Sequence, residues 1–211
     1  MAPGKSGSRK RRPEAPAVAA AFDMLRFGHA NTLDLRASLP TGAEATRRAE
    51  AFLRERQVAG ATEVLVITGR GNQSADGIAV VRPAVVALLA TLRRRGVVAG
   101  WSEHTPGSLV VTPAPVRALL ESPRRHGDRP LPATADPSSL TALDAPVRDA
   151  LRRLAERSLQ HLGAPSDGPF LQDEMLRQFS VLSVAVPPGA DRDRRLRAAA
   201  ELALRELDGL E

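Results

Sequence analysis

The first half of the chain alternates short apolar runs with longer amphipathic segments. The apolar runs have the length of strands, whereas the segments between the first three of them repeat apolar side chains at helical spacing. The runs are residues 32–35, 63–67, 97–101 and 108–112. Their order along the chain, β-α-β-α-β-β, predicts a compact two-layer α/β domain over residues 30–113.

The two predicted helices of this domain have recognisable ends. Thr41 and Glu44 have the spacing of a capping box at the start of the first helix, and Gly60 supplies a stop at its end. In the second helix, Pro83 is tolerated only in the first turn. Three arginines at residues 93–95, followed by a glycine, favour an end there because cations suit the negative end of the helix dipole.

The second half of the chain has a different pattern. Residues 114–142 are rich in Pro, Ser, Thr and Asp, so we expect a linker there, with a short helix at residues 116–121. Apolar residues then recur at helical spacing, which predicts a mostly helical extension over residues 143–211. No motif in this extension indicates chemistry.

The composition excludes several classes of protein. The chain of 211 residues has no cysteine, which excludes disulfide frameworks and thiolate chemistry. No apolar run reaches the roughly 18 residues that a membrane span needs, and the basic amino terminus lacks the apolar core of a secretory signal. We therefore expect a cytoplasmic protein with no membrane partner.

Positive charge is concentrated near the amino terminus. The chain has 30 Lys and Arg against 24 Asp and Glu, and five of the basic residues but no acid fall within residues 1–13. We expect residues 1–20 to be a basic disordered tail. Such a tail beside a basic domain is typical of proteins that bind a phosphate backbone through counterion release. A solubilising arm would have the same composition.

A glycine-rich loop, GRGNQSADG, follows the apolar run at residues 63–67. Gly69 and Gly71 allow a sharp turn and a close approach to a ligand, and Arg70 between them adds a positive charge. The start of the next helix would attract an anion. The spacing of a nucleotide P-loop is absent. The loop favours a phosphate group as its ligand, with a plain turn as the alternative.

Four short motifs, in this order, resemble the small MutS-related (Smr) domain. They are LDLR at 33–36, EVLVITGRG at 63–71, Gly77-Ile78 with VRPAV at 81–85, and a hairpin with Gly107 near its turn. The resemblance covers about residues 30–113. It implies a fold like the C-terminal domain of translation initiation factor three, and an association with DNA or RNA that in several members includes endonuclease activity.

The chain departs from the family pattern at both motif histidines. Arg36 stands at the histidine of Leu-Asp-Leu-His, and Thr68 stands at the histidine of His-Gly-Lys-Gly. Arginine retains affinity for phosphate, but neither residue exchanges a proton near neutral pH as histidine does. The resemblance therefore implies binding more strongly than catalysis, and enzyme activity stays open. No cofactor is expected, and a divalent metal is implied only if the domain is a nuclease.

The candidate nucleic-acid contacts lie near the ends of the first two predicted strands and the start of the second helix. They are Arg36, Gly69, Arg70, Gly71 and Arg82. Asp34 is the catalytic candidate if the domain is active, and no metal site is predicted. Arg36 and Arg70 would lie close together if the two strands pair in parallel. Two structural alternatives remain open, namely an ion pair for Arg36 and a cap of backbone amides for Asp34.

Two functions of different classes follow. The first is a nucleic-acid-binding module that contacts the phosphate backbone, with weak or absent endonuclease activity. The second is a protein-interaction or scaffolding domain that has lost the family chemistry, with the C-terminal helices packing on the first domain or on a second copy. The basic first domain and its glycine loop favour the first function. The low aromatic content, five Phe, one Trp and no Tyr, favours backbone contacts over base stacking.

Overall fold

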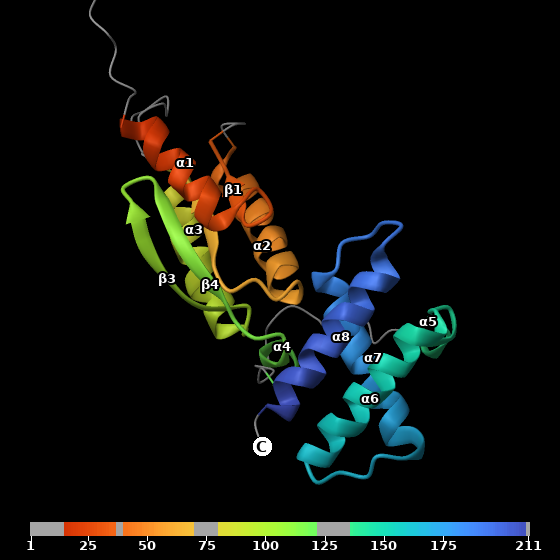
Figure 1. Cartoon of the computed structure of the whole chain (residues 1–211). Coiled ribbons are helices and arrows are strands. Elements are labelled where there is room, and N and C mark those ends of the chain that lie inside the picture. Colours follow the sequence, from red (N-terminus) through yellow and green to blue (C-terminus); the bar gives the residue numbers. More distant parts are fainter. Residues whose placement is uncertain (1–14, 37–39, 70–79, 122–135, 210–211) are drawn as a thin grey trace, which may run out of the picture.

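The computed structural model describes residues 15–36, 40–69, 80–121 and 136–209 (Figure 1). An α/β unit with a four-stranded sheet comes first, and a helical region follows it, which is the fold class that the sequence predicts. The strands are β1 (Thr32–Asp34), β2 (Val64–Ile67), β3 (Val98–Thr105) and β4 (Ser108–Pro113). Among the described residues, no helix combines the length and the apolar character needed to cross a bilayer.

The sheet has the strand order β1-β2-β4-β3. β1 and β2 pair in parallel, with Asp34 opposite Ile67, so the carboxyl ends of these two strands lie at the same edge of the sheet. β4 pairs antiparallel with both β2 and β3, and Ile67 lies opposite Ser108. The turn between β3 and β4 therefore lies beside the carboxyl end of β2.

Two helices, α2 (Gly42–Val58) and α3 (Val81–Arg94), cover one face of the sheet. The predicted cap is present, since the Glu44 N–H donates to Thr41 Oγ1 at 3.2 Å. Gly60 follows the end of α2 with a φ of +74°, a conformation that glycine adopts without strain. The apolar face of α3, including Leu89, packs with Leu53 of α2 and Val66 of β2 in one core.

A further helix that the sequence did not predict, α1 (Ala15–Phe27), lies on the opposite face of the sheet. Phe27 is 5% exposed and packs with Leu65 and Val110. The expected tail over residues 1–20 is therefore wrong from residue 15 onward. The alanine-rich sequence has a high helix propensity, and Phe27 gives the helix a place on the sheet. Residues 1–14 lie outside the described residues.

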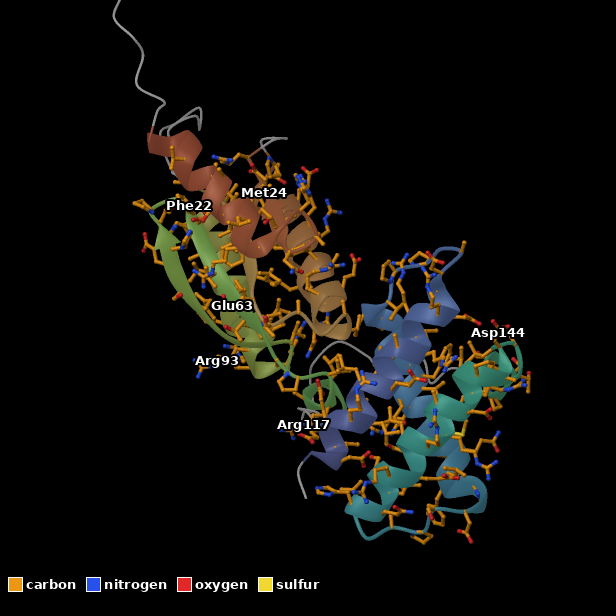
Figure 2. The ribbon with its side chains drawn as sticks, viewed as in Figure 1. Phe22, Met24, Glu63, Arg93, Arg117 and Asp144 are labelled. Atoms are coloured by element: carbon orange, nitrogen blue, oxygen red, sulfur yellow. The ribbon has the colours of Figure 1, made fainter. Side chains whose placement is uncertain are left out.

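The helical region contains α6 (Ala145–His161), α7 (Gly168–Ala185) and α8 (Arg192–Asp208), preceded by the short helices α4 (Arg117–Glu121) and α5 (Pro137–Thr141). Its core includes Val58 from the end of α2 and Val116 from the segment after β4. The Arg117 N–H also donates to Glu206 Oε2 at 2.8 Å, where α4 meets α8 (Figure 2). The helical region is thus packed against one end of the α/β unit.

A polar cluster connects α7 to α6 and α4 in this region. Glu174 is 9% exposed and accepts hydrogen bonds from Arg177 Nε at 2.6 Å, Gln178 Nε2 at 2.7 Å and Ser158 Oγ at 3.1 Å. Arg177 also donates to the Leu120 carbonyl at 3.1 Å. Burial raises the pKa of Glu174, but the hydrogen bonds and the charge of Arg177 outweigh burial, so the net pKa is lowered.

Candidate nucleic-acid interface

The carboxyl ends of β1 and β2, the β3–β4 turn and the amino ends of α2 and α3 meet at one edge of the sheet. We call this set of segments the carboxyl edge. The N–H groups of Thr68 and Gly69 both donate to the Gly107 carbonyl, at 2.9 and 3.0 Å, which joins β2 to the turn. A Cβ placed on Gly42 would lie 3.3 Å from Cγ1 of Val80, so the two helix starts are in contact.

Arg36 and Asp34 form an ion pair at the end of β1. Arg36 Nη2 lies 2.7 Å from Asp34 Oδ2, and Nε lies 3.0 Å from Oδ1. Asp34 Oδ1 also accepts the Arg36 backbone N–H at 2.8 Å. The structure therefore contains both the ion pair that was the alternative for Arg36 and a backbone N–H bound by Asp34, which was the alternative for that residue. The hydrogen bond from Arg36 lowers the pKa of Asp34, and partial burial opposes this only in part.

The Arg36 side chain extends from β1 across the turn that follows β2. Gly69 has a φ of +76°, and a Cβ at this position would lie 3.3 Å from Arg36 Cγ. The methylenes of Arg36 therefore pack against the glycine backbone, while its guanidinium stays accessible, with 58% of the side chain exposed. The parallel pairing brings Arg36 to the glycine turn. The expected proximity of Arg36 to Arg70 stays a prediction, because Arg70 and Gly71 lie outside the described residues.

Thr68, at the end of β2, has a structural role. The residue is 7% exposed, and its hydroxyl lies 3.3 Å from the Gly107 carbonyl and 3.4 Å from the Gly69 carbonyl. This hydroxyl donates within the turn, so it is not free to act on a ligand. The side chain fastens the end of β2 to the β3–β4 hairpin.

Arg82, the nucleic-acid contact predicted near the start of its helix, is bound to the β3–β4 hairpin. Its Nη2 lies 3.0 Å from Glu103 Oε2, and its Nη1 donates to the Pro106 carbonyl at 3.0 Å. Only 24% of the side chain is exposed. The sequence does not predict these contacts, because Glu103, 21 residues further along the chain, lies beside α3 only in the folded sheet. Arg82 still lies at the carboxyl edge, but two of its donors are occupied.

A pair formed by a histidine and an aspartate lies beside this edge and is not predicted from the sequence. His104 lies in β3, with Nε2 2.7 Å from Asp23 Oδ1 on α1. Its ring also meets Phe27 edge-on, with centroids 6.0 Å apart. Asp23 and Phe27, four residues apart, lie on one face of a helix. The four-residue spacing of Asp23 and Phe27 is the signal that the sequence offers for this contact. It is informative only when the segment is already expected to be a helix.

The fold and this edge define a mixed α/β domain with a glycine turn and an accessible arginine where two parallel strands end. Residues 33–108 match the model of the Smr domain family, so this part of the chain is similar to an Smr domain. The family is linked to nucleic-acid binding or endonuclease activity. The match spans less than half of the chain, and the helical region lies outside it. No curated protein and no solved structure gives a significant match.

The described part of the edge offers no ready metal centre. Within residues 15–36, 40–69, 80–121 and 136–209, no group of three or more His, Asp or Glu side chains is arranged to hold a metal ion. Asp34 alone would be a weak ligand, because Arg36 occupies both of its carboxylate oxygens.

Proposed function

We propose that the carboxyl edge binds the phosphate backbone of DNA or RNA and that the domain cleaves this backbone poorly or not at all. The observation that carries the proposal is Arg36, whose methylenes pack over Gly69 at the ends of the two parallel strands and whose side chain is 58% exposed. Among the described residues, its Nη1 has no hydrogen-bond partner. A guanidinium so placed can donate two charge-assisted hydrogen bonds to one phosphate.

The mode of binding follows from the chemistry of the ion pair. Asp34 holds Arg36 in place before binding, and a phosphate then competes with Asp34 for the same donors. The pair is largely accessible to water, so exchanging one anion for another costs little. Contacts of this kind position a protein on nucleic acid without reading base sequence. Affinity should therefore vary little between sequences and should fall as salt concentration rises.

Poor cleavage is proposed from the state of Asp34 and Thr68. The hydrogen bond from Arg36 keeps the Asp34 pKa low, so this carboxylate is a weak proton acceptor at neutral pH. The Thr68 hydroxyl is buried in the turn. A guanidinium can stabilise charge that develops on a phosphate, but it does not transfer a proton near neutral pH. The edge thus supports binding better than acid–base chemistry.

The test is a binding and cleavage series on supercoiled plasmid and on a structured RNA, each with and without Mg²⁺. We expect salt-sensitive binding in every arm and little or no cleavage in any. Absence of binding to both nucleic acids at low salt would refute the proposal. Efficient cleavage that disappears in Asp34→Ala, while binding persists, would refute its second half, since Asp34 would then be catalytic.

A second candidate function is protein interaction through the C-terminal helices. Phe170 is 57% exposed and Val184 is 53% exposed, and both belong to α7. Exposed apolar side chains on one helix favour contact with a partner or a second copy. Analytical ultracentrifugation of the wild type and of Phe170→Ser would detect self-association through α7.

A cytoplasmic location stays a prediction from the sequence.

A further inference from the structure

Helix α1 is apolar on two opposite sides. Phe27 is 5% exposed and packs against the sheet. Val18, Phe22 and Leu25 are 46%, 66% and 84% exposed, and at about 100° per residue they project from one side of the helix. Phe27 follows Val18 by nine positions, so it projects from the opposite side. We call the exposed residues Val18, Ala21, Phe22 and Leu25 the outer stripe.

The outer stripe has the reverse of the usual pattern, because a surface helix ordinarily presents polar side chains to water. Adjacent exposed apolar side chains of this size are typical of a contact surface. Figure 1 shows α1 on the outside of the α/β unit, on the side of the sheet away from α2 and α3. The described part of the chain therefore leaves this stripe without a partner.

Other segments of this sequence do not match the stripe. The residues outside the described ranges contain one large apolar residue in each segment, namely Met1, Leu39, Ile78, Leu131 and Leu210. A single apolar side chain does not complement a stripe that extends over two helical turns. The partner is therefore a second molecule.

The charges of α1 indicate what kind of molecule this is. The outer stripe contains no ionisable residue. The two charged residues of the helix are paired within the chain, Asp23 with His104 and Arg26 with Glu63, each at 2.7 Å. The stripe thus offers no free charge for a phosphate backbone or a charged peptide. Two copies of a chain with a net charge of +6 can approach each other here without opposing charges.

The outer stripe is also complementary to itself when two helices run antiparallel. A two-fold axis between Ala21 and Phe22 places each Phe22 beside the Ala21 of a second copy. The same axis places each Leu25 beside a Val18. Large side chains then face smaller ones, which fills space well. In a parallel pair, the two Phe22 rings would compete for the same place.

The area of the stripe fits a weak, reversible dimer. With full side-chain areas of about 150 to 200 Å², the exposed fractions of Val18, Phe22 and Leu25 leave about 350 Å² in each chain. Two stripes therefore bury about 700 Å², before the alanines and the helix backbone are added, against about 1,200 Å² or more in stable complexes. Association should depend on concentration, with a micromolar or weaker dissociation constant.

We propose that the outer stripe of α1 binds a second copy of this chain in an antiparallel, two-fold contact. The contact is distinct from one through α7, which lies in the helical region. It does not depend on the proposed function, because the dimer forms without nucleic acid. The assembly carries two carboxyl edges, one in each chain.

Sedimentation equilibrium of the full chain, without nucleic acid, tests the proposal. The wild type should show a monomer–dimer equilibrium, and Phe22→Ser should raise its dissociation constant at least about tenfold. Phe170→Ser is a matched control, since it makes the same change at a residue of α7 that is 57% exposed. It should leave the dissociation constant unchanged. A wild type that is monomeric up to about 200 µM, or a dimer lost in Phe170→Ser but kept in Phe22→Ser, would overturn the proposal.

A pair of charge substitutions tests the antiparallel register and keeps the result decisive if Phe22→Ser loosens the fold. Val18→Lys and Leu25→Glu should each weaken the dimer. When both are made in one chain, the new lysine of each copy faces the new glutamate of the other, so the combined variant should dimerise more tightly than either single variant. A combined variant weaker than both would overturn the antiparallel contact. Circular dichroism verifies that each variant is folded.

Two further measurements separate other occupants and the proposed function. Vesicles of phosphatidylglycerol and phosphatidylcholine test a lipid surface. Cosedimentation of the wild type that is lost in Phe22→Ser, with no dimer in solution, would assign the stripe to lipid and overturn the proposal. Duplex DNA and duplex RNA at low salt test the proposed function separately. A wild type that dimerises through the stripe but binds neither duplex would support this inference and refute the proposed function.

Discussion

Two arginine–carboxylate pairs, one in each region of the molecule, differ in what surrounds them. Arg36 and Asp34 at the carboxyl edge are 58% and 37% exposed, whereas Arg177 and Glu174 in the helical region are 26% and 10% exposed. Glu174 has two further hydrogen-bond donors, Ser158 and Gln178. The same chemical pair is thus an exchangeable contact at the edge and a fixed connection in the helical region.

The comparison teaches that burial, and not the identity of the pair, decides which arginine can serve a ligand. Water screens the exposed pair and lets a phosphate replace the carboxylate, whereas breaking the buried pair leaves an uncompensated charge. α2 connects the two regions: it starts at the carboxyl edge, and Val58 at its end joins the core of the helical region. Its 17 residues span about 25 Å between the two regions, so binding and stability should respond to different substitutions.

The largest effect is expected for Glu174→Ala. The change removes the acceptor for three side chains and leaves Arg177 without its carboxylate, which should lower the free energy of unfolding by about 3 kcal/mol. Urea denaturation followed by circular dichroism measures this loss. Glu156→Ala, which breaks the exposed pair with Arg152, should change stability by less than about 0.5 kcal/mol. A similar loss in both variants would contradict the comparison.

The pH dependence of stability sharpens this first prediction. The Glu174 pKa is lowered in the folded chain, so its contribution is present above its ordinary value of 4.5 and is lost as the pH falls through the lowered value. The wild type should therefore lose stability below pH 4.5. Glu174→Gln should lose less over the same range, because it has no carboxylate to protonate. Identical acid profiles would show that the pair does not govern this loss.

The next effect is expected for Arg36→Ala. Loss of a charge-assisted phosphate contact should weaken binding to every sequence by about 1 to 1.5 kcal/mol, with little change in stability. Arg152→Ala is a matched control, because Arg152 and Glu156 are 64% and 35% exposed, much like the pair at the edge. Fluorescence anisotropy on several sequences measures both. An equal loss in the control would mean that net charge, and not position, carries the binding.

A smaller effect of opposite sign is expected for Asp34→Asn. Asparagine keeps an oxygen for the Arg36 backbone N–H, but it no longer competes for the guanidinium, so affinity should rise by about 0.5 to 1 kcal/mol. Glu156→Gln makes the same change of charge in the helical region and should have a smaller effect. The same anisotropy titration checks both. Weaker binding in Asp34→Asn would show that the ion pair is needed to hold Arg36 in place.

The smallest effect is expected for Arg82→Ala. Its donors already serve Glu103 and the Pro106 carbonyl, so its loss should weaken binding by less than about 0.5 kcal/mol. The same titrations, compared with Arg36→Ala, measure the difference. If both arginines proved equally important, Arg82 would have to leave the hairpin when nucleic acid binds.

The sequence alone determined the elements whose signals are local. Thr41 with Glu44, Gly60, and Pro83 in the first turn of α3 mark helix ends through contacts between near neighbours, and the structure has those ends. The apolar runs predicted the order of strands along the chain. The family motifs predicted the site at the edge where Arg36 packs against Gly69. These features depend on interactions within a few residues or on a topology with few alternatives.

Only the tertiary structure decided which charged groups meet. Arg82 pairs with Glu103, Asp23 pairs with His104, and Arg177 donates to the Leu120 carbonyl. Each contact joins elements that are far apart in the chain. No local pattern specifies such pairs, because many carboxylates are available to each cation until packing brings one within reach. The position of α1 was also decided by packing. The alanine-rich segment has a high helix propensity, but its place in the fold is fixed only when Phe27 is buried on the sheet.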